Sequence, residues 1–153
     1  MKKIIYLAGY GRSGSTILER ILGANKNIIA LGELKDFLYL LDSFEERCSC
    51  GAKLNYCSFW NPICNDFKSI NLLNLKKDQL NFESIFGFCH LFLKNKKSNR
   101  EEYKKFLENL FSRIISQSNN EIKYVTDSSK TARESFFRPL ILKKINNIEV
   151  KMI

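Results

Sequence analysis

The N-terminal 23 residues constrain the fold more than any other part of the chain, because they join three features in a fixed order. Residues 3–8 read Lys-Ile-Ile-Tyr-Leu-Ala, a largely apolar run that is typical of a buried parallel strand. Residues 9–15 are rich in glycine and hydroxyl side chains. Residues 16–23 place apolar side chains at helical spacing and end in Gly23, which suits a helix terminus. This order predicts the first strand–helix unit of an α/β protein.

The rest of the chain continues the alternation of strands and helices. The helix at residues 101–117 has the clearest pattern, with apolar side chains at i, i+3, i+4, i+7, i+8, i+11 and i+12 from Tyr103. Residues 43–64 are predicted to be irregular, and residues 94–100 to form a solvated loop. Strands separated by helices predict a mostly parallel sheet. The predicted strands are residues 28–31, 122–126 and 148–153, and the other helices are residues 34–41, 78–95 and 132–145.

Length and charge limit the domain count and the classes of partner. The 153 residues suffice for one α/β core but not for two sizeable ones. The net charge of +9 indicates an anionic partner, although the abundance of Lys, Asn and Ile also reflects composition bias. No stretch reaches the roughly 18 consecutive apolar residues of a membrane span. The apolar run after Lys3 is too short for a signal peptide, so we predict a cytoplasmic protein with no stable membrane span.

The turn after the first strand predicts an anion site. A helix N-terminus presents free N–H groups and the positive end of the helix dipole, and glycines allow the backbone to approach an anion. Ser13, Ser15 and Thr16 add hydroxyl donors, and Arg12 adds a permanent charge with a planar fork of donors. A plain turn that uses its glycines only to relieve strain is the alternative, but it needs none of these four donors.

Two nucleotide-binding classes compete for this turn on spacing alone. A nucleotide triphosphatase is disfavoured because Ser15 stands where the phosphate-binding lysine of that loop belongs. A dinucleotide-binding oxidoreductase remains open, since Gly9, Gly11 and Gly14 satisfy Gly-x-Gly-x-x-Gly. Glu33, 19 residues beyond Gly14, then stands where a ribose-binding acid is expected.

A resemblance to a known family adds a third class. Residues 10–18, Tyr-Gly-Arg-Ser-Gly-Ser-Thr-Ile-Leu, resemble the 5′-phosphosulfate loop of sulfotransferases that use 3′-phosphoadenylyl sulfate (PAPS). Residues 24–34 with their Gly-Glu, residues 124–131 with Asp-x-x-Lys, and the cysteines of residues 48–60 resemble further segments of that family in the same order. Asn25-Lys26 departs from the family's His-Pro-like pair. The resemblance implies a three-layer, P-loop-like fold in a single sulfotransferase domain over residues 1–153, with a cysteine-rich insert at about residues 43–66.

The resemblance also implies roles for particular side chains. Glu33 would be the general base, as the equivalent glutamate is in tyrosyl-protein sulfotransferases, and Lys130 would neutralise charge on the transferred sulfuryl group or on the bridging oxygen. Asp127 is expected to cap or orient its turn rather than to react. For Glu33 a solvated acid near a helix start is the alternative, and for Lys130 a surface lysine. The residues expected to bind the donor are Gly11, Arg12, Ser13, Gly14, Ser15 and Thr16.

The expected reaction transfers a sulfuryl group from PAPS to a hydroxyl or amine acceptor and leaves 3′,5′-adenosine bisphosphate (PAP). No metal and no nucleic acid partner are expected. The chain stops where the family continues into its 3′-phosphate site, so we expect a C-terminally incomplete fold that binds PAPS weakly and turns over little. The alternatives are the oxidoreductase domain and a degenerate, non-catalytic nucleotide-binding module.

Four cysteines cluster in the irregular segment. Cys48, Cys50, Cys57 and Cys64 could bind zinc, form disulfides or remain free thiols. Their spacing is not the paired Cys-x-x-Cys of zinc ribbons, so free structural thiols are predicted. His90 is predicted to be a packed helix residue rather than a catalyst.

Overall fold

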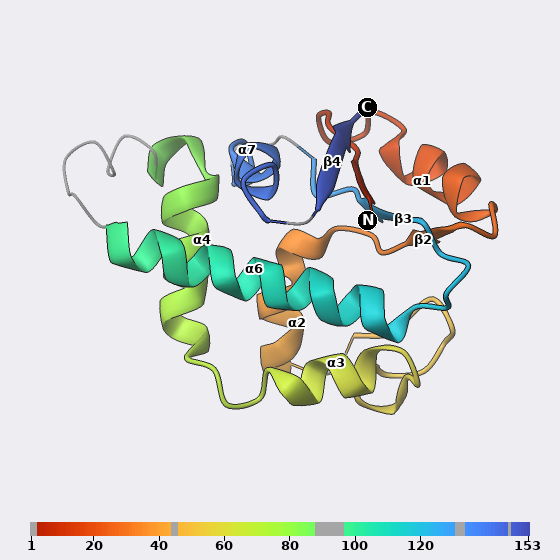
Figure 1. The fold of residues 1–153 in the computed structure, drawn as a ribbon, viewed down its shortest axis with the longest axis horizontal. Coiled ribbons are helices and arrows are strands. Elements are labelled where there is room, and N and C mark those ends of the chain that lie inside the picture. Colours follow the sequence, from red (N-terminus) through yellow and green to blue (C-terminus); the bar gives the residue numbers. More distant parts are fainter. Residues whose placement is uncertain (1–2, 44–45, 88–96, 131–133, 147) are drawn as a thin grey trace.

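The protein is an α/β structure with one four-stranded, all-parallel sheet (Figure 1). The computed structural model describes residues 3–43, 46–87, 97–130, 134–146 and 148–153. The strands are β1 (Lys3–Tyr6), β2 (Ile28–Ala30), β3 (Tyr124–Asp127) and β4 (Glu149–Met152), in the order β2-β3-β1-β4. The helices are α1 (Ser15–Gly23), α2 (Phe37–Ser43), α3 (Trp60–Asp66), α4 (Leu72–Glu83), α6 (Lys97–Gln117) and α7 (Arg138–Leu142), with short 3₁₀ turns η1 (Leu34–Asp36) and η2 (Leu54–Tyr56). The predicted α/β class and parallel sheet are confirmed.

The register of the sheet places apolar side chains from all four strands side by side. Ile4 pairs with Val125 on one neighbour and with Val150 on the other. Ile29 of β2 also pairs with Val125, which is fully buried. Because all four strands are parallel, their carboxyl ends lie at the same edge of the sheet.

The helices α2, α3, α4 and α6 form a layer of their own, and α1 lies apart from them beside the strands (Figure 1). The periodic face of α6 is buried as predicted, with Tyr103, Leu110 and Ile114 each 1% exposed or less. Phe67 of the α3 end packs edge-on against Phe106 and Phe37. Among the described residues, no helix combines the length and the apolar character that a membrane span requires.

Several predicted boundaries are wrong. Within the described part of the predicted helix at residues 132–145, only Arg138–Leu142 is helical, because Pro139 suits the first turn of a helix and residues 134–137 form turns. Residues 43–64 are not wholly irregular, since they contain η2 and most of α3. Helix α6 begins at Lys97, inside the predicted loop, and α4 begins at Leu72, before the predicted start at residue 78. Of the predicted helix at residues 78–95, residues 78–83 and 85–87 are helical, with a break at Ser84, and residues 88–95 lie outside the described part of the chain. His90 lies outside the described residues.

The apolar spacing of α1 does not mark the buried side of this helix. Ile17 and Ile21 are 67% and 65% exposed, whereas Glu19 is only 6% exposed. The Glu19 side chain turns inward because it accepts hydrogen bonds from Gly32, Thr126 and Ser128 at the ends of β2 and β3.

Candidate functional site

The candidate site lies at the carboxyl edge of the sheet, where loops from three neighbouring strands meet. The loop after β1 contains Arg12, the loop after β2 contains Glu33, and the loop after β3 contains Lys130. Parallel α/β sheets bind ligands at this edge, because the loops there converge while the strands hold their bases rigid. All the residues predicted to bind or react therefore come to one side of the molecule.

The loop after β1 has a backbone that a side chain rarely adopts. Arg12 has φ of 65° and Gly14 has φ of 81°, so two left-handed residues precede the helix. Gly14 is the N-cap of α1, and no side chain of the described residues caps that helix. The N-terminal N–H groups of α1 therefore face the loop without a capping oxygen, as an anion site requires.

The predicted donor-binding side chains differ in exposure. Arg12, Ser13 and Thr16 are exposed, whereas Ser15 is 6% exposed. The exposed side chains are free to meet a ligand from solvent. Ser15 instead packs at the first turn of α1, so its backbone is a better candidate for anion contact than its hydroxyl.

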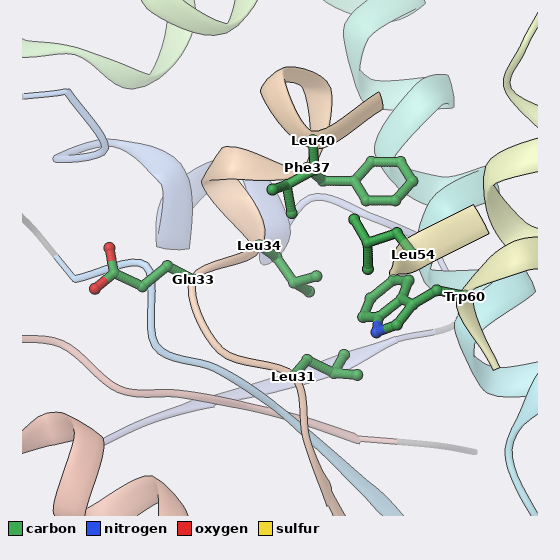
Figure 2. A pocket seen from close by; sticks show the side chains of 7 residues that line it. All are labelled: Leu31, Glu33, Leu34, Phe37, Leu40, Leu54 and Trp60. Carbon is green, nitrogen blue, oxygen red and sulfur yellow. The ribbon is translucent and has the colours of Figure 1, made fainter. Parts of the chain in front are cut away.

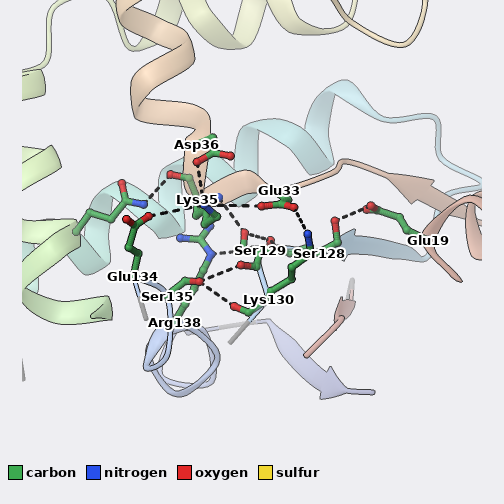
Figure 3. Close-up of polar contacts among 12 residues, drawn as sticks. Glu19, Glu33, Lys35, Asp36, Ser128, Ser129, Lys130, Glu134, Ser135 and Arg138 are labelled. Atoms are coloured by element: carbon green, nitrogen blue, oxygen red, sulfur yellow. Dashed lines mark hydrogen bonds and ion pairs between the residues drawn. The ribbon is translucent and has the colours of Figure 1, made fainter. Parts of the chain in front are cut away.

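Glu33 and Lys130, predicted from sequence segments almost 100 residues apart, contact each other. The Lys130 Nζ lies 2.5 Å from the Glu33 Oε1, and the Lys35 Nζ lies 3.7 Å from the Glu33 Oε2 (Figure 3). Lys130 itself has φ of 61°. Arg12 and Lys130 are thus the two non-glycine residues with positive φ in the described part of the chain. Such strain costs about 1–2 kcal/mol per residue and clusters at functional sites.

Lys35 sits at the centre of several acidic groups. Burial disfavours its charged form, but Asp36, then Glu33 and Glu134, outweigh burial and raise the pKa of the ammonium group. Its backbone N–H donates to the Ser129 Oγ at 2.9 Å, which ties the Glu33 loop to the Lys130 loop. Lys35 could not be predicted from the sequence, because no motif includes it.

The Lys130 loop rests on hydrogen bonds that fix its strained backbone. The Ser135 hydroxyl donates to the Lys130 carbonyl oxygen at 2.8 Å, and the Tyr6 hydroxyl donates to the same oxygen. Asp127 Oδ1 accepts from the backbone N–H of Ser129 at 3.0 Å. The predicted orienting role of Asp127 is confirmed by this contact.

A buried ionic network lies beneath that loop. Arg138 donates from Nε to Asp127 at 2.9 Å and from Nη1 to Glu83 at 2.6 Å, and the Tyr103 hydroxyl donates to the same Glu83 oxygen at 2.6 Å. All four side chains are at most 1% exposed. Burial raises the pKa of Glu83 despite its cationic partner. Burial also raises the pKa of Tyr103, and Glu83 beside it adds to the shift.

Glu19 forms a second buried contact that the sequence did not reveal. Its Oε1 accepts from the Thr126 hydroxyl at 2.5 Å and from the Gly32 N–H at 2.9 Å, and its Oε2 accepts from the Ser128 hydroxyl at 2.6 Å. These bonds join α1 to the ends of β2 and β3. In the sequence Glu19 is a charged residue between the apolar positions of α1, a pattern that indicates the solvent-exposed face of a helix.

Two hollows adjoin Glu33. A cavity of about 30 Å³, lined by Leu31, Leu34, Leu54 and Trp60 among others, has Glu33 at its margin (Figure 2). The carboxylate points away from the apolar side chains in that view. On another side, an open groove of about 470 Å³ includes Glu33, Asp36, Tyr39 and Glu46. The groove has the volume of a small-molecule site, whereas the cavity has room for a water molecule or two.

Comparisons with protein-family models, with curated proteins and with solved structures find no match. The residues at this edge of the sheet, and the resemblance of the sequence segments that carry them, are the indications of function.

Proposed function

We propose that the protein is a PAPS-dependent sulfotransferase of the P-loop-like fold, acting on a hydroxyl or amine acceptor. The observation that carries the proposal is the contact between Glu33 and Lys130 beside the loop of Arg12. Three segments that resemble sulfotransferase motifs separately also meet at one edge of the sheet. A chance resemblance would not require such convergence.

The proposed reaction assigns one task to each segment. The N–H groups at the start of α1, with Arg12 and the hydroxyls of Ser13 and Thr16, hold the 5′-phosphosulfate. The acceptor oxygen attacks sulfur and forms a new O–S bond, while the bond between sulfur and the bridging phosphate oxygen breaks and PAP leaves. Glu33 takes the acceptor's proton. Lys130 neutralises the charge that develops on the bridging oxygen.

The ammonium group of Lys130 is paired with the Glu33 carboxylate, whose side chain is 33% exposed. Binding of an anionic donor would draw Lys130 toward the sulfuryl group and free the Glu33 Oε1 to accept a proton. The open groove beside Glu33 is the proposed place for the acceptor.

The order of the strands favours this proposal over a dinucleotide-binding domain. In the dinucleotide fold, the strand that carries the ribose-binding acid lies directly beside the first strand. Here β3 lies between β1 and β2, which separates Glu33 from the glycine-rich loop by a strand. Glu33 is also engaged by two lysines, so it is not a free acceptor for ribose hydroxyls.

The test is transfer of labelled sulfuryl from PAPS to a panel of phenols, alcohols and amines. We expect Glu33→Gln to lower turnover by about 10²- to 10⁴-fold, the usual loss for a general base, while PAP binding is kept. Glu134→Gln is the matched control, because Glu134 also lies near Lys35 but is 74% exposed and has no role in the reaction. Wild-type turnover by Glu33→Gln would remove Glu33 from the base role, and PAP binding without transfer to any acceptor would favour the non-catalytic module.

A further inference from the structure

Three cysteines of the predicted insert come together at the surface, away from the sheet edge. The sulfur atoms of Cys48, Cys50 and Cys57 all lie within 4.8 Å of one another. The sulfurs of Cys50 and Cys57 are 3.7 Å apart. All the cysteines in the described part of the chain are free thiols. Cys64, the fourth member of the sequence cluster, is not among these three sulfurs. It is 2% exposed on α3, and burial raises its pKa to about 11.

We propose that Cys48, Cys50 and Cys57 bind one zinc ion as thiolates, with solvent at the fourth position. Two thiolates on a tetrahedral zinc ion, each about 2.3 Å from the metal, lie about 3.8 Å apart. The separation of Cys50 and Cys57 matches this value, whereas a disulfide needs about 2.05 Å. A disulfide between these two would also leave Cys48 without a partner, while a metal uses all three sulfurs.

The backbone around the cysteines is already shaped to hold them. Residues 46–54 form a tight hairpin, in which Arg47 and Lys53 pair across the strands and the Cys48 N–H donates to the Ala52 carbonyl at 2.9 Å. Gly51 closes the turn with φ of 87°, which a side chain would disfavour. The hairpin thereby fixes Cys48 and Cys50 on one side of the proposed zinc ion. Cys57 is fixed on the other side, because its carbonyl accepts from the Asn61 N–H of α3 at 2.8 Å.

The charge of the surroundings fits the proposed ion. Three thiolates on Zn²⁺ carry a net charge of −1, and binding releases the three thiol protons. Arg47 and Lys53 flank the cluster along the hairpin, and the Arg47 Nη1 donates to the Gly51 carbonyl at 2.8 Å, close to the turn. The zinc would clamp the hairpin to the start of α3, and so fix Leu54 and Trp60, which line the cavity beside Glu33.

The test measures metal content and affinity in the full-length chain, purified under reducing conditions without chelator. We expect about one zinc per chain by elemental analysis. Titration of the stripped protein with Co²⁺ should give the visible bands of a tetrahedral thiolate site, which Zn²⁺ then abolishes. Cys50→Ser should weaken zinc binding by at least about 100-fold, since loss of an outer-sphere partner alone costs 10- to 100-fold. Cys50 is exposed, so this variant should keep the fold, which far-ultraviolet circular dichroism checks.

Cys64→Ala is the matched control and should bind zinc as the wild type does. The proposal is overturned if the reduced protein holds no zinc or if Cys50→Ser binds it with wild-type affinity. Loss of zinc from a folded Cys64→Ala would overturn the three-cysteine ligand set. A disulfide between Cys50 and Cys57 in freshly purified protein, detected by mass spectrometry, would replace the metal site with a redox pair.

Discussion

At the scale of single residues, two cations are held in backbone conformations that their side chains disfavour. Arg12 and Lys130 have φ of 65° and 61°, and each lies in a loop that is predicted to contact the ligand. The structure maintains Lys130 through bonds to its carbonyl from Tyr6 and Ser135. A surface lysine without a role would gain nothing from this arrangement. We therefore expect that the strain places the ammonium group, and that the two effects can be separated by substitution.

Lys130→Gly and Lys130→Ala both remove the ammonium group, but only glycine relieves the left-handed backbone. We expect Lys130→Gly to be more stable to unfolding than Lys130→Ala by about 1 kcal/mol. Both variants should slow sulfuryl transfer equally. Chemical denaturation checks the first expectation and the transfer assay the second.

Lys35 offers the control for that comparison. It lies in η1 and is not among the residues with positive φ, so Lys35→Gly should be less stable than Lys35→Ala by about 0.5–1 kcal/mol. The same order at position 130 would show that its backbone is not left-handed in solution.

At the scale of elements, the strands and the long helix could be predicted from the sequence, but the polar contacts between elements could not. Helix α6 was found because seven apolar positions repeat at helical spacing, and periodicity survives in any fold that buries one face. Glu83 and Arg138 gave no such signal, because a charged residue in a helix usually lies at the surface and its partner here is 55 residues away. The burial of Glu19 could not be predicted either, because a charged residue in a helix usually lies at the surface.

The strand-end motifs behave differently from these buried contacts. The glycine-rich loop could be predicted from its residue types, whereas Gly32-Glu33 and the Asp127-to-Lys130 segment were indicated by their resemblance to sulfotransferase segments. That Glu33 touches Lys130 depends on β2 and β3 being neighbours, which no short segment encodes. The cysteine cluster also depends on the fold. The spacing of its cysteines in the sequence disfavours a metal site, whereas the hairpin brings three of their sulfur atoms together.

The buried network between α4, α6 and α7 predicts how stability depends on alkaline pH. The pKa values of Tyr6 and Tyr103 are raised from 10.0, chiefly by burial, so the folded state keeps both phenols protonated after they ionise in the unfolded chain. Their contribution to stability is full below pH 10 and is lost as pH rises further. Tyr103→Phe removes one of these protons, so its free energy of unfolding should fall less steeply above pH 10, by about 1.4 kcal/mol per pH unit.

Urea denaturation between pH 9 and pH 11.5 checks this expectation. Tyr39→Phe, at a tyrosine that is 46% exposed, is the control and should keep the wild-type slope. Parallel curves for Tyr103→Phe and wild type would contradict the burial of the Tyr103 hydroxyl against Glu83.

At the scale of the whole molecule, the fold brings one edge of the sheet together from segments that span most of the sequence. The loop of Arg12 follows β1, the central partner of β3 and β4, while Glu33 and Lys130 follow β2 and β3. The net charge of +9 greatly exceeds the two or three cations at the site, so most of it has no part in binding the donor. The proposed function therefore depends on the residues of the site and not on the overall charge.

Binding of the product nucleotide tests the central claim most directly. Thermal unfolding with PAP at about 100 times its dissociation constant should stabilise the protein by about 2.7 kcal/mol, which raises Tm by about 5–10 °C for a chain of this size. Arg12→Ala should abolish this rise in Tm. Arg20→Ala, in the last turn of α1, should keep it. Stabilisation by NAD or NADP in place of PAP, or no response to any nucleotide, would contradict the account.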